Sequence, residues 1–352
     1  MKKILRVILI LLLVIIVAVG ALLGWLTITE FKSETGPVTA THRSTSEGEV
    51  RSEYLTILSF NTGYAALSRN EDFFMDGGSG VRPAERQLVE DNLAGILAIL
   101  QREDADINLL QEVDTDSSRS FGIDEAACYA DGLDRDSAFA LNYSCPYVPY
   151  PLPTTIGKVN SGLLTLSKIQ IDRADRLALP CPFSWPVRIA NLKRCLLVTL
   201  YDIEGTDKKL AVINLHLEAY DNGEGKRAQT EMLCAVLRSY YEEYGWYVIA
   251  GGDFNQSFPG CVEAYPIQDT EKWTPGILTG EALPEGFHFV YSADHATCRL
   301  LDAPYQEGKT QLYVIDGFIV SDNMTVQSVE VLDEGFAYSD HNPVVLRVSL
   351  DG

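Results

Sequence analysis

The chain has little basic charge for its length, and this limits the partners it can bind. Its 352 residues include 28 lysines and arginines against 49 aspartates and glutamates, a formal net charge of -21. Such a chain repels polyanions unless the binding site is locally basic or holds a metal ion. We find no stripe rich in lysine and arginine, so nucleic acid is a disfavoured partner. The same acidity also suits an ordinary solvated surface.

The sequence also lacks the motifs of cysteine-based zinc sites and of serine hydrolases. The cysteines contain no CxxC pair and have no histidine beside them at metal spacing, which argues against a zinc site. Their odd number, seven, leaves at least one thiol unpaired, and we expect mostly buried thiols, with one or two disulfides if the domain faces an oxidising compartment. No G-x-S-x-G motif accompanies the histidines, which excludes the usual serine-hydrolase pattern.

An apolar N-terminus is the clearest feature that is present. After three basic residues, the run from Val7 to Thr29 has no charge and approaches the ~20 residues that a helix needs to cross a bilayer. Basic residues before the run and acidic ones after it place the N-terminus in the cytoplasm and the remainder outside. We therefore predict a single-pass cell-membrane anchor over residues 1–29. The alternative is a signal peptide cleaved near Ala18 and Gly20, which would give a secreted protein.

The remaining chain is predicted to contain a linker over 30–52 and one folded domain over 53–352. The linker is rich in Thr, Ser, Gly and Glu. In the domain, strand and helix signals alternate, which indicates a layered α/β fold. Strands are predicted over 54–60, 107–111, 161–167, 196–201, 210–217, 247–251, 312–320 and 344–350. Helices are predicted over 82–101, with Pro83 in the first turn, and 226–244. The segments 115–153, 177–191 and 258–311 are expected to be irregular loops that shape a binding site.

Polar residues follow or interrupt these strands one after another, in types that suit a hard cation and a phosphate. Taken alone, Asn61 is an ordinary turn former, and His216 is best explained as a hydrogen-bonded core histidine. Asp316 in the apolar run VIDGFIV is harder to explain in this way, because a buried carboxylate must be paired, metal-bound or protonated. The full set is Asn61, Glu112, His216, Asp253, Asn255, Asp316, Asp340 and His341.

The order of seven short segments resembles the signature series of the endonuclease/exonuclease/phosphatase superfamily. These segments read LSFNTG, LLQEVD, NSGLLTLS, INLHLEAY, GGDFNQ, VIDGFIVS and YSDHNPV. They run from about Thr56 to Val348, nearly the whole folded unit. The resemblance implies an α/β (α+β) fold, a four-layer sandwich of two mixed β-sheets flanked by helices, with the N-terminal transmembrane helix before it. It places the site at one edge of the sandwich.

The resemblance also implies a metal site and a histidine at the scissile phosphate. Glu112 is the implied principal ligand of Mg²⁺, or alternatively Mn²⁺, with Asn61 and Asp340 completing or water-bridging the coordination. His341 is implied to contact the phosphate as a base or as a hydrogen-bond donor. Asp316 is implied to hold the ring of His341.

Four further residues take implied roles around the reacting phosphorus. Asp253 is implied to orient or deprotonate the attacking water, and Asn255 to donate to a phosphate oxygen. His216 is implied to lie on the leaving-group side, and Asn160 to be a further polar residue near the phosphate. The implied reaction is in-line attack by water without a covalent intermediate.

The resemblance therefore implies an enzyme, a metal-dependent phosphoric ester hydrolase, but leaves the substrate open. The anchor and the short linker favour a lipid head group or a small phosphorylated metabolite. A surface or extracellular nuclease is the second hypothesis, and a non-catalytic binding domain is the third. We expect a monomer. One group of loop aromatics either forms an apolar rim for a lipid or sugar or packs as loop cores: Tyr143, Tyr147, Tyr150, Phe183 and Trp185.

Overall fold

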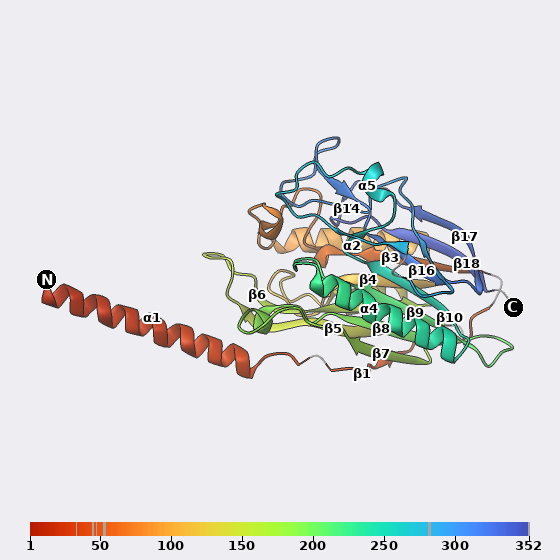
Figure 1. Cartoon of the computed structure of the whole chain (residues 1–352), viewed down its shortest axis with the longest axis horizontal. Helices are drawn as coiled ribbons and strands as arrows, with labels where there is room; N and C mark the ends of the chain where they lie inside the picture. Colours follow the sequence, from red (N-terminus) through yellow and green to blue (C-terminus); the bar gives the residue numbers. More distant parts are fainter. Residues whose placement is uncertain (33, 44–45, 47, 52–53, 281–282, 351–352) are drawn as a thin grey trace.

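Two seven-stranded sheets, packed face to face, form the framework of the domain. The computed structural model describes residues 1–352 except 33, 44–45, 47, 52–53, 281–282 and 351–352. Helix α1 (Lys2–Ile28) projects from the end of the domain opposite the C-terminus (Figure 1). The architecture confirms the predicted α/β sandwich of two mixed sheets.

The first sheet contains the strands that hold His216, Asp253 and Asp316. From edge to edge it contains β1 (Gly36–Pro37), β7 (Arg173–Ala178), β8 (Cys195–Asp202), β9 (Lys209–His216), β10 (Tyr247–Asp253), β16 (Asp316–Ser321) and β13 (Phe287–Val290). Strands β9 and β10 are parallel, whereas β16 runs antiparallel to β10. The carboxyl ends of β9 and β10 therefore meet at one edge.

The second sheet repeats this arrangement across the core. Its order is β17 (Met324–Val331), β18 (Val344–Leu350), β3 (Leu55–Asn61), β4 (Ile107–Asp114), β6 (Gly157–Ser167), β5 (Asp136–Val148) and β2 (Ala40–Thr41). Strands β3 and β4 are parallel at its centre. Between the two sheets lies an apolar core that includes Ile57, Leu109, Leu197, Val212, Ile249, Phe318 and Leu346.

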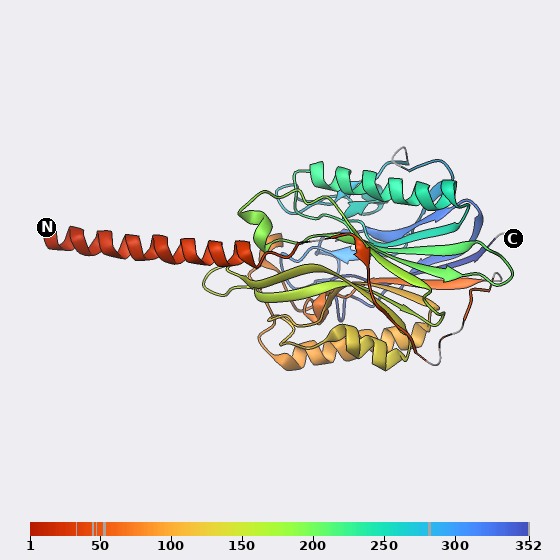
Figure 2. The same cartoon turned by 90° about the horizontal axis from the view of Figure 1, so that it is seen from below.

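Helices cover the outer faces of both sheets, which makes the four layers (Figure 2). Helices α2 (Arg86–Glu103) and α3 (Glu125–Leu133) cover one side, and α4 (Glu224–Arg238), continued by the π-turn η4 (Ser239–Glu243), covers the other. On α2, Val89, Ile96 and Leu100 are spaced for one face and pack on the second sheet. The short elements are η1 (Gly63–Ala65), η2 (Phe74–Asp76), η3 (Val187–Ala190), α5 (Cys261–Ala264), the pair β11 (Gln256–Ser257) and β12 (Gly276–Ile277), and the pair β14 (Cys298–Arg299) and β15 (Leu312–Tyr313).

Several predicted boundaries are wrong, each for a physical reason. The segment 115–153 is not irregular, because it holds α3 and the long strand β5; two register shifts against β6 break the alternation that would have indicated this strand. The single strand expected over 312–320 is two strands, β15 and β16. Between them Ile315 turns its amide to Thr297 and its carbonyl to Phe254, so the chain leaves the small sheet for the large one.

Helix α2 and the N-terminal linker segment also differ from simple expectation. Helix α2 begins at Arg86 rather than Arg82, because Glu85 is extended. Pro83 therefore precedes the helix. Within 30–52, β1 pairs with β7 and β2 pairs with β5, so parts of this segment extend the two sheets.

A β-bulge in β4 determines where the side chain of Glu112 points. Leu110 pairs with Leu164 and Val113 with Gly162, so two residues of β4 lie opposite one residue of β6. Glu112 itself has a φ of 56°, a left-handed conformation that is uncommon for a residue with a side chain.

The buried amide of Asn214, on β9 of the opposite sheet, fixes this bulge. Its Nδ2 donates to the carbonyls of Leu110 (3.1 Å) and Leu164 (3.0 Å), and its Oδ1 accepts from Gln111 (2.8 Å). One fully buried side chain thus joins both sheets at the irregular point of β4.

Asn214→Leu should lower the free energy of unfolding by about 2–3 kcal/mol, because it removes buried hydrogen-bond partners from two carbonyls and one amide. Urea unfolding followed by circular dichroism measures this. The control is Gln327→Leu, since Gln327 bonds Ser349 on the exposed face of β17 and its loss should cost less than about 0.5 kcal/mol. Equal effects from the two substitutions would contradict the bridging role.

Candidate active site

Residues far apart in the sequence converge where the central parallel strands end. Asn61 is the last residue of β3, His216 of β9 and Asp253 of β10. Asp316 begins β16 and lies directly opposite Asp253 in the sheet register. His341 lies in the loop that leads into β18, three residues before the strand begins. Parallel neighbours end at a common edge, which explains why residues at strand ends in the sequence meet in space.

A histidine–carboxylate pair forms the centre of this group. His341 Nδ1 lies 2.8 Å from Asp316 Oδ2, and both side chains are buried. The ring's Nε2 faces the Asn61 amide at 3.4 Å, Asp253 at 3.8 Å and Asp340 at 4.0 Å. Burial alone would lower the pKa of His341, but Asp316 and the surrounding negative groups hold it well above the usual value. His341 is therefore placed to carry a proton.

Asp253 accepts hydrogen bonds from Asn61 and Asn255 and faces both histidines. Asn61 Nδ2 donates to its Oδ2 at 3.0 Å, and the backbone amide of Asn255 donates to its Oδ1 at 2.8 Å. His216 Nε2 lies 3.4 Å from the same Oδ2. Burial, and then the charge of Asp316, raise the pKa of Asp253 to about 7. Burial, followed by Arg194 and His341, lowers the pKa of His216 well below its usual value.

Asn255 is held by the backbone next to this carboxylate. Its side-chain Nδ2 donates to the carbonyl of Leu217 at 2.9 Å, and its backbone is left-handed with a φ of 51°. Asparagine tolerates this conformation better than most residues. The turn after β10 thus brings both Asp253 and Asn255 to the cavity floor.

The carboxylates of Glu112 and Asp340 fit a cation. Burial and then the charge of Asp340 raise the pKa of Glu112 to about 8, and burial raises the pKa of Asp340 as well. These acids with raised pKa values, beside the buried Asp253, form an excess of negative charge that a divalent ion would neutralise. Carboxylate and amide oxygens are also the ligands that suit Mg²⁺ or Mn²⁺.

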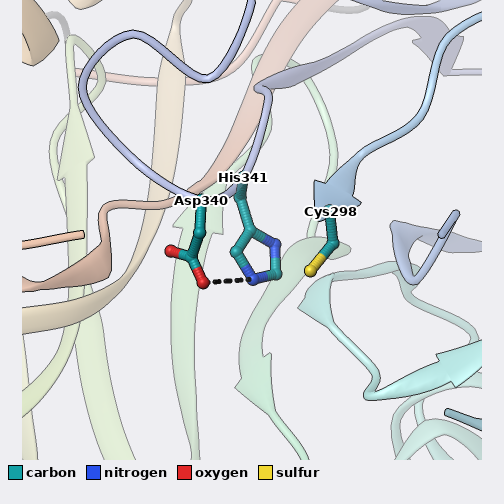
Figure 3. A group of neighbouring side chains, drawn as sticks. All are labelled: Cys298, Asp340 and His341. Atoms are coloured by element: carbon teal, nitrogen blue, oxygen red, sulfur yellow. Dashed lines mark ion pairs between the residues drawn. The ribbon is translucent and has the colours of Figure 1, made fainter. Parts of the chain in front are cut away.

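Ligand atoms approach one another most closely in two other groups. Among the described residues, Cys298, Asp340 and His341 form one set and Asp253, Asp316 and His341 the other; in each, one ligand atom per residue lies within 4.8 Å of the others. Figure 3 shows the His341 ring between the carboxylate of Asp340 and the thiol of Cys298. Cys298, which no metal-binding motif marks in the sequence, thus lies beside Asp340 and His341 in the fold. Burial raises the pKa of this thiol to about 12, so it is a protonated and poor ligand.

Asn160 is the one implied site residue that the structure keeps apart. Its Oδ1 accepts from Ser144 at 2.7 Å, and its backbone amide donates to Ser117. It does not line the cavity formed by the described residues. Its role near a phosphate stays a prediction.

The assembled groups form the floor of a cavity of about 620 Å³. The polar floor contains Glu112, His216, Asp253, Asn255, Asp340 and His341. The walls are largely apolar and include Phe73, Phe74, Tyr150, Ile156, Val187 and Ile189. Other charged side chains also line the cavity, among them Arg119, Arg194 and Glu218. A cavity that combines polar groups with a largely apolar lining suits a ligand that has both kinds of surface.

Two positioning residues were missed in the sequence. Thr297 Oγ1 accepts from the amides of Ile315 (3.0 Å) and Asp316 (3.1 Å), which fixes the carboxylate beneath His341. Ser339 Oγ donates to the carbonyl of Asn61 at 2.8 Å and accepts from the amide of His341. Ser339 stands next to the motif residues in YSDHNPV, whereas nothing in the sequence around Thr297 marks it.

Comparison with known proteins gives a family match and shared folds. Residues 58–341 match the model of the Endonuclease/Exonuclease/phosphatase family. Among curated proteins, no sequence matches the chain.

Solved structures share the fold at low sequence identity. An endonuclease/exonuclease/phosphatase from Beutenbergia cavernae DSM 12333 gives a TM-score of 0.57 at 17% identity, over 85% of this chain and 72% of that one. ANGEL2, a 2′,3′-cyclic phosphatase, gives 0.55 at 16% identity, over 90% and 99% of the two chains. A family protein from Leptotrichia buccalis C-1013-b gives 0.54 at 15% identity, over 84% and 100%.

Cys298 should resist alkylation in the folded protein, because the thiolate is the reactive form and burial keeps this thiol protonated. Iodoacetamide labelling followed by peptide mass spectrometry tests this, with the partly exposed Cys181 as the internal reference. We expect Cys181 to be labelled first and Cys298 only after unfolding. Rapid labelling of Cys298 in the native protein would show that its thiol is ionised. Cys298 would then be a candidate metal ligand.

Proposed function

We propose, since the chain belongs to the Endonuclease/Exonuclease/phosphatase family, that it is an enzyme that hydrolyses a phosphate ester with the help of a divalent cation. Family members are phosphoesterase and nuclease hydrolases. The observation that carries the proposal is the buried His341–Asp316 pair, which faces Asp253 and the acids of the cavity floor. This combination of a proton-bearing histidine and clustered carboxylates suits the attack of water on phosphorus.

The roles of the chain's own groups follow from their protonation. Asp253 orients a water molecule and takes its proton, since its raised pKa of about 7 gives it useful basicity. The water oxygen forms a bond to phosphorus while the ester P–O bond breaks, and the leaving oxygen gains a proton through solvent. His341, held in its charged form by Asp316, donates to a non-bridging phosphate oxygen. Asn255 supplies a further amide donor, and His216 lies on the leaving-group side.

Glu112, Asp340 and Asn61 are the residues that would hold Mg²⁺, for which Mn²⁺ is an alternative. The bound ion would supply positive charge to the phosphate oxygens and to the leaving oxygen. The amide oxygen of Asn61 already accepts from Gly63 at 3.1 Å, so it would contribute its second lone pair or bind through water.

Helix α1 has the length and apolarity to span a membrane or to serve as a signal sequence. We propose that it is an uncleaved anchor, with the catalytic domain on the extracytoplasmic side. Its apolar side chains are exposed from Ile4 to Val19, and basic residues precede them. Substrates that fit an anchored acidic enzyme are lipid head groups and small phosphorylated metabolites, while a net charge of -21 disfavours nucleic acid.

His341→Ala should lower the rate of hydrolysis of bis-p-nitrophenyl phosphate by about 10³-fold with Mg²⁺ present, because it removes the donor to the phosphate. The matched control is His288→Ala, since His288 also pairs with an aspartate, Asp322, but on the surface at 3.0 Å. It should leave the rate nearly unchanged. The same assay on sphingomyelin, phosphatidylinositol phosphates and plasmid DNA separates lipid and nuclease activities. Equal losses in the two variants would refute the assignment of His341.

Glu112→Gln should weaken Mg²⁺ binding by about 10–100-fold, because it removes a charged ligand from a hard cation. Isothermal titration calorimetry on the whole protein measures this without relying on turnover. Glu263→Gln, which removes the same charge from an exposed position on α5, is the control and should bind as wild type. If wild type neither binds Mg²⁺ nor cleaves any substrate, the enzyme proposal fails and the binding-domain hypothesis gains.

A further inference from the structure

The last turns of α1 are packed into the catalytic domain. Leu26 is buried, and Leu22 and Leu23 join it in an apolar cluster. The domain side of this cluster is formed by Tyr143, Cys145, Val148, Ile156, Val159, Ile189, Ala190 and Leu192. The helix is therefore not a free tether, because part of its surface belongs to the domain's packed interior.

Polar contacts fix the same junction. Trp185 Nε1 donates to Thr27 Oγ1 at 3.0 Å. Arg188 binds both carboxylate oxygens of Glu30, at 2.8 and 3.2 Å, and Lys193 lies 3.5 Å from the same carboxylate. A bidentate arginine–carboxylate pair restricts orientation as well as distance. The end of the helix thus has one defined position relative to the domain.

That position places the helix in the wall of the catalytic cavity. Leu23 and Leu26 line the same cavity whose floor holds Glu112 and His341. Six residues separate Leu22 from Ile28, the end of α1, which is about 9 Å along the axis. If α1 spans a bilayer, the domain surface that touches Leu22 reaches the depth of the head-group layer, roughly 5–10 Å thick.

Apolar side chains around the cavity mouth are exposed in the same region. Tyr150 is 62% exposed and Leu152 is 80% exposed, both on the loop between β5 and β6. Trp185 is 53% exposed, beside the end of α1. In both views the β5–β6 loop extends alongside α1, toward its N-terminus (Figures 1 and 2). Aromatic residues at this level are typical of a membrane–water interface.

We propose that this end of the domain, with Tyr150, Leu152 and Trp185 around the mouth, lies in the head-group layer, so that the cavity takes its substrate directly from the bilayer. The substrate class is then a phosphorylated membrane lipid. Its phosphate reaches the polar floor, and its apolar part lies along the wall that α1 completes. The proposal rests on the proposed function and on α1 as an anchor. Water attacks the lipid's phosphorus and an ester P–O bond breaks, so at least one product remains in the bilayer.

A small phosphorylated metabolite and a phosphorylated lipid would each require a different kind of cavity wall. A small phosphorylated metabolite is polar throughout and gains nothing from leucines of a membrane helix at the mouth. A lipid brings its head group to the polar floor and leaves its apolar part among the apolar side chains of the wall. The shared wall of cavity and anchor therefore favours the lipid.

The experiment uses the full chain in phosphatidylcholine vesicles that contain sphingomyelin, phosphatidic acid and phosphatidylinositol phosphate. The same head groups on short, water-soluble chains, together with bis-p-nitrophenyl phosphate, form the soluble arm. We measure the ratio of the hydrolysis rate in the bilayer to the rate in solution. Tyr150→Glu and Leu152→Glu should each lower this ratio about tenfold, because a charge opposes insertion into the interface. Leu152 lies outside the cavity lining, so its effect does not depend on damage to the cavity.

Tyr54→Glu is the matched control. Tyr54 is 65% exposed, close to the value for Tyr150, but it precedes β3 at the strand end away from the site. Its ratio should equal that of wild type. Cleavage of soluble esters but not of bilayer lipids, or equal ratios in all variants, would overturn the membrane-facing cavity. Cleavage of neither arm by wild type with Mg²⁺ would instead overturn the proposed function on which it rests.

Discussion

The side-chain amide of Asn214 holds the β-bulge of β4, and the position of Glu112 in the site depends on this bulge. A regular strand alternates its side chains between the two faces, so a shift of one residue would send Glu112 and Gln111 to opposite sides from those they occupy. The bulge sets this register, and Asn214 reaches across from the other sheet to bond the carbonyls around it. Gln111 completes the link at 2.8 Å. The distance between the two sheets and the direction of Glu112 are thereby fixed by the same group.

The electrostatics of the floor follow from this rigid placement. Several carboxylates are buried at one edge, and each raises the cost of ionising the others. His341 offsets part of this charge, while Asp316 keeps one oxygen, Oδ1, without a hydrogen-bond partner in the part of the chain that the structure describes. Such an arrangement is unfavourable for the empty protein and favourable for a site that receives a cation and a phosphate with its surrounding donors. Stability and function are opposed here, as they often are at preorganised sites.

The sequence was most informative where chemistry sits at the end of a regular strand. Asn61, His216 and Asp253 could be placed because apolar runs mark β3, β9 and β10, and each of these residues ends its strand. Asp316 begins β16, inside what was expected to be one strand over 312–320. It was least informative where position depends on an irregularity. Asn214 looks like one polar residue in an apolar strand, and its partners are carbonyls that exist as targets only because of a bulge in another sheet. Strand β5 was missed because its register shifts erase the alternation. The edge strand β17 was missed because a register shift between Val326 and Ser328 interrupts its alternation of apolar and polar residues.

Two contacts between segments far apart in the chain could not be predicted from the sequence. No metal-binding motif surrounds Cys298 in the sequence, yet an isolated antiparallel β-bridge pairs it with His341. The contact between α1 and the domain could not be predicted either, since an apolar run long enough for a bilayer gives no sign that its final turns also pack on protein.

Because of this junction, helix α1 is also a structural part of the folded domain. Leu23 and Leu26 belong to the packed interior of the domain as much as to the apolar helix α1. In a soluble fragment that begins after Glu30, the side chains of Tyr143, Val148 and Ile189 would face water. One side of the cavity would also be open. The last turns of α1 complete the packing and the cavity wall, so the folded unit begins within helix α1 and not after it.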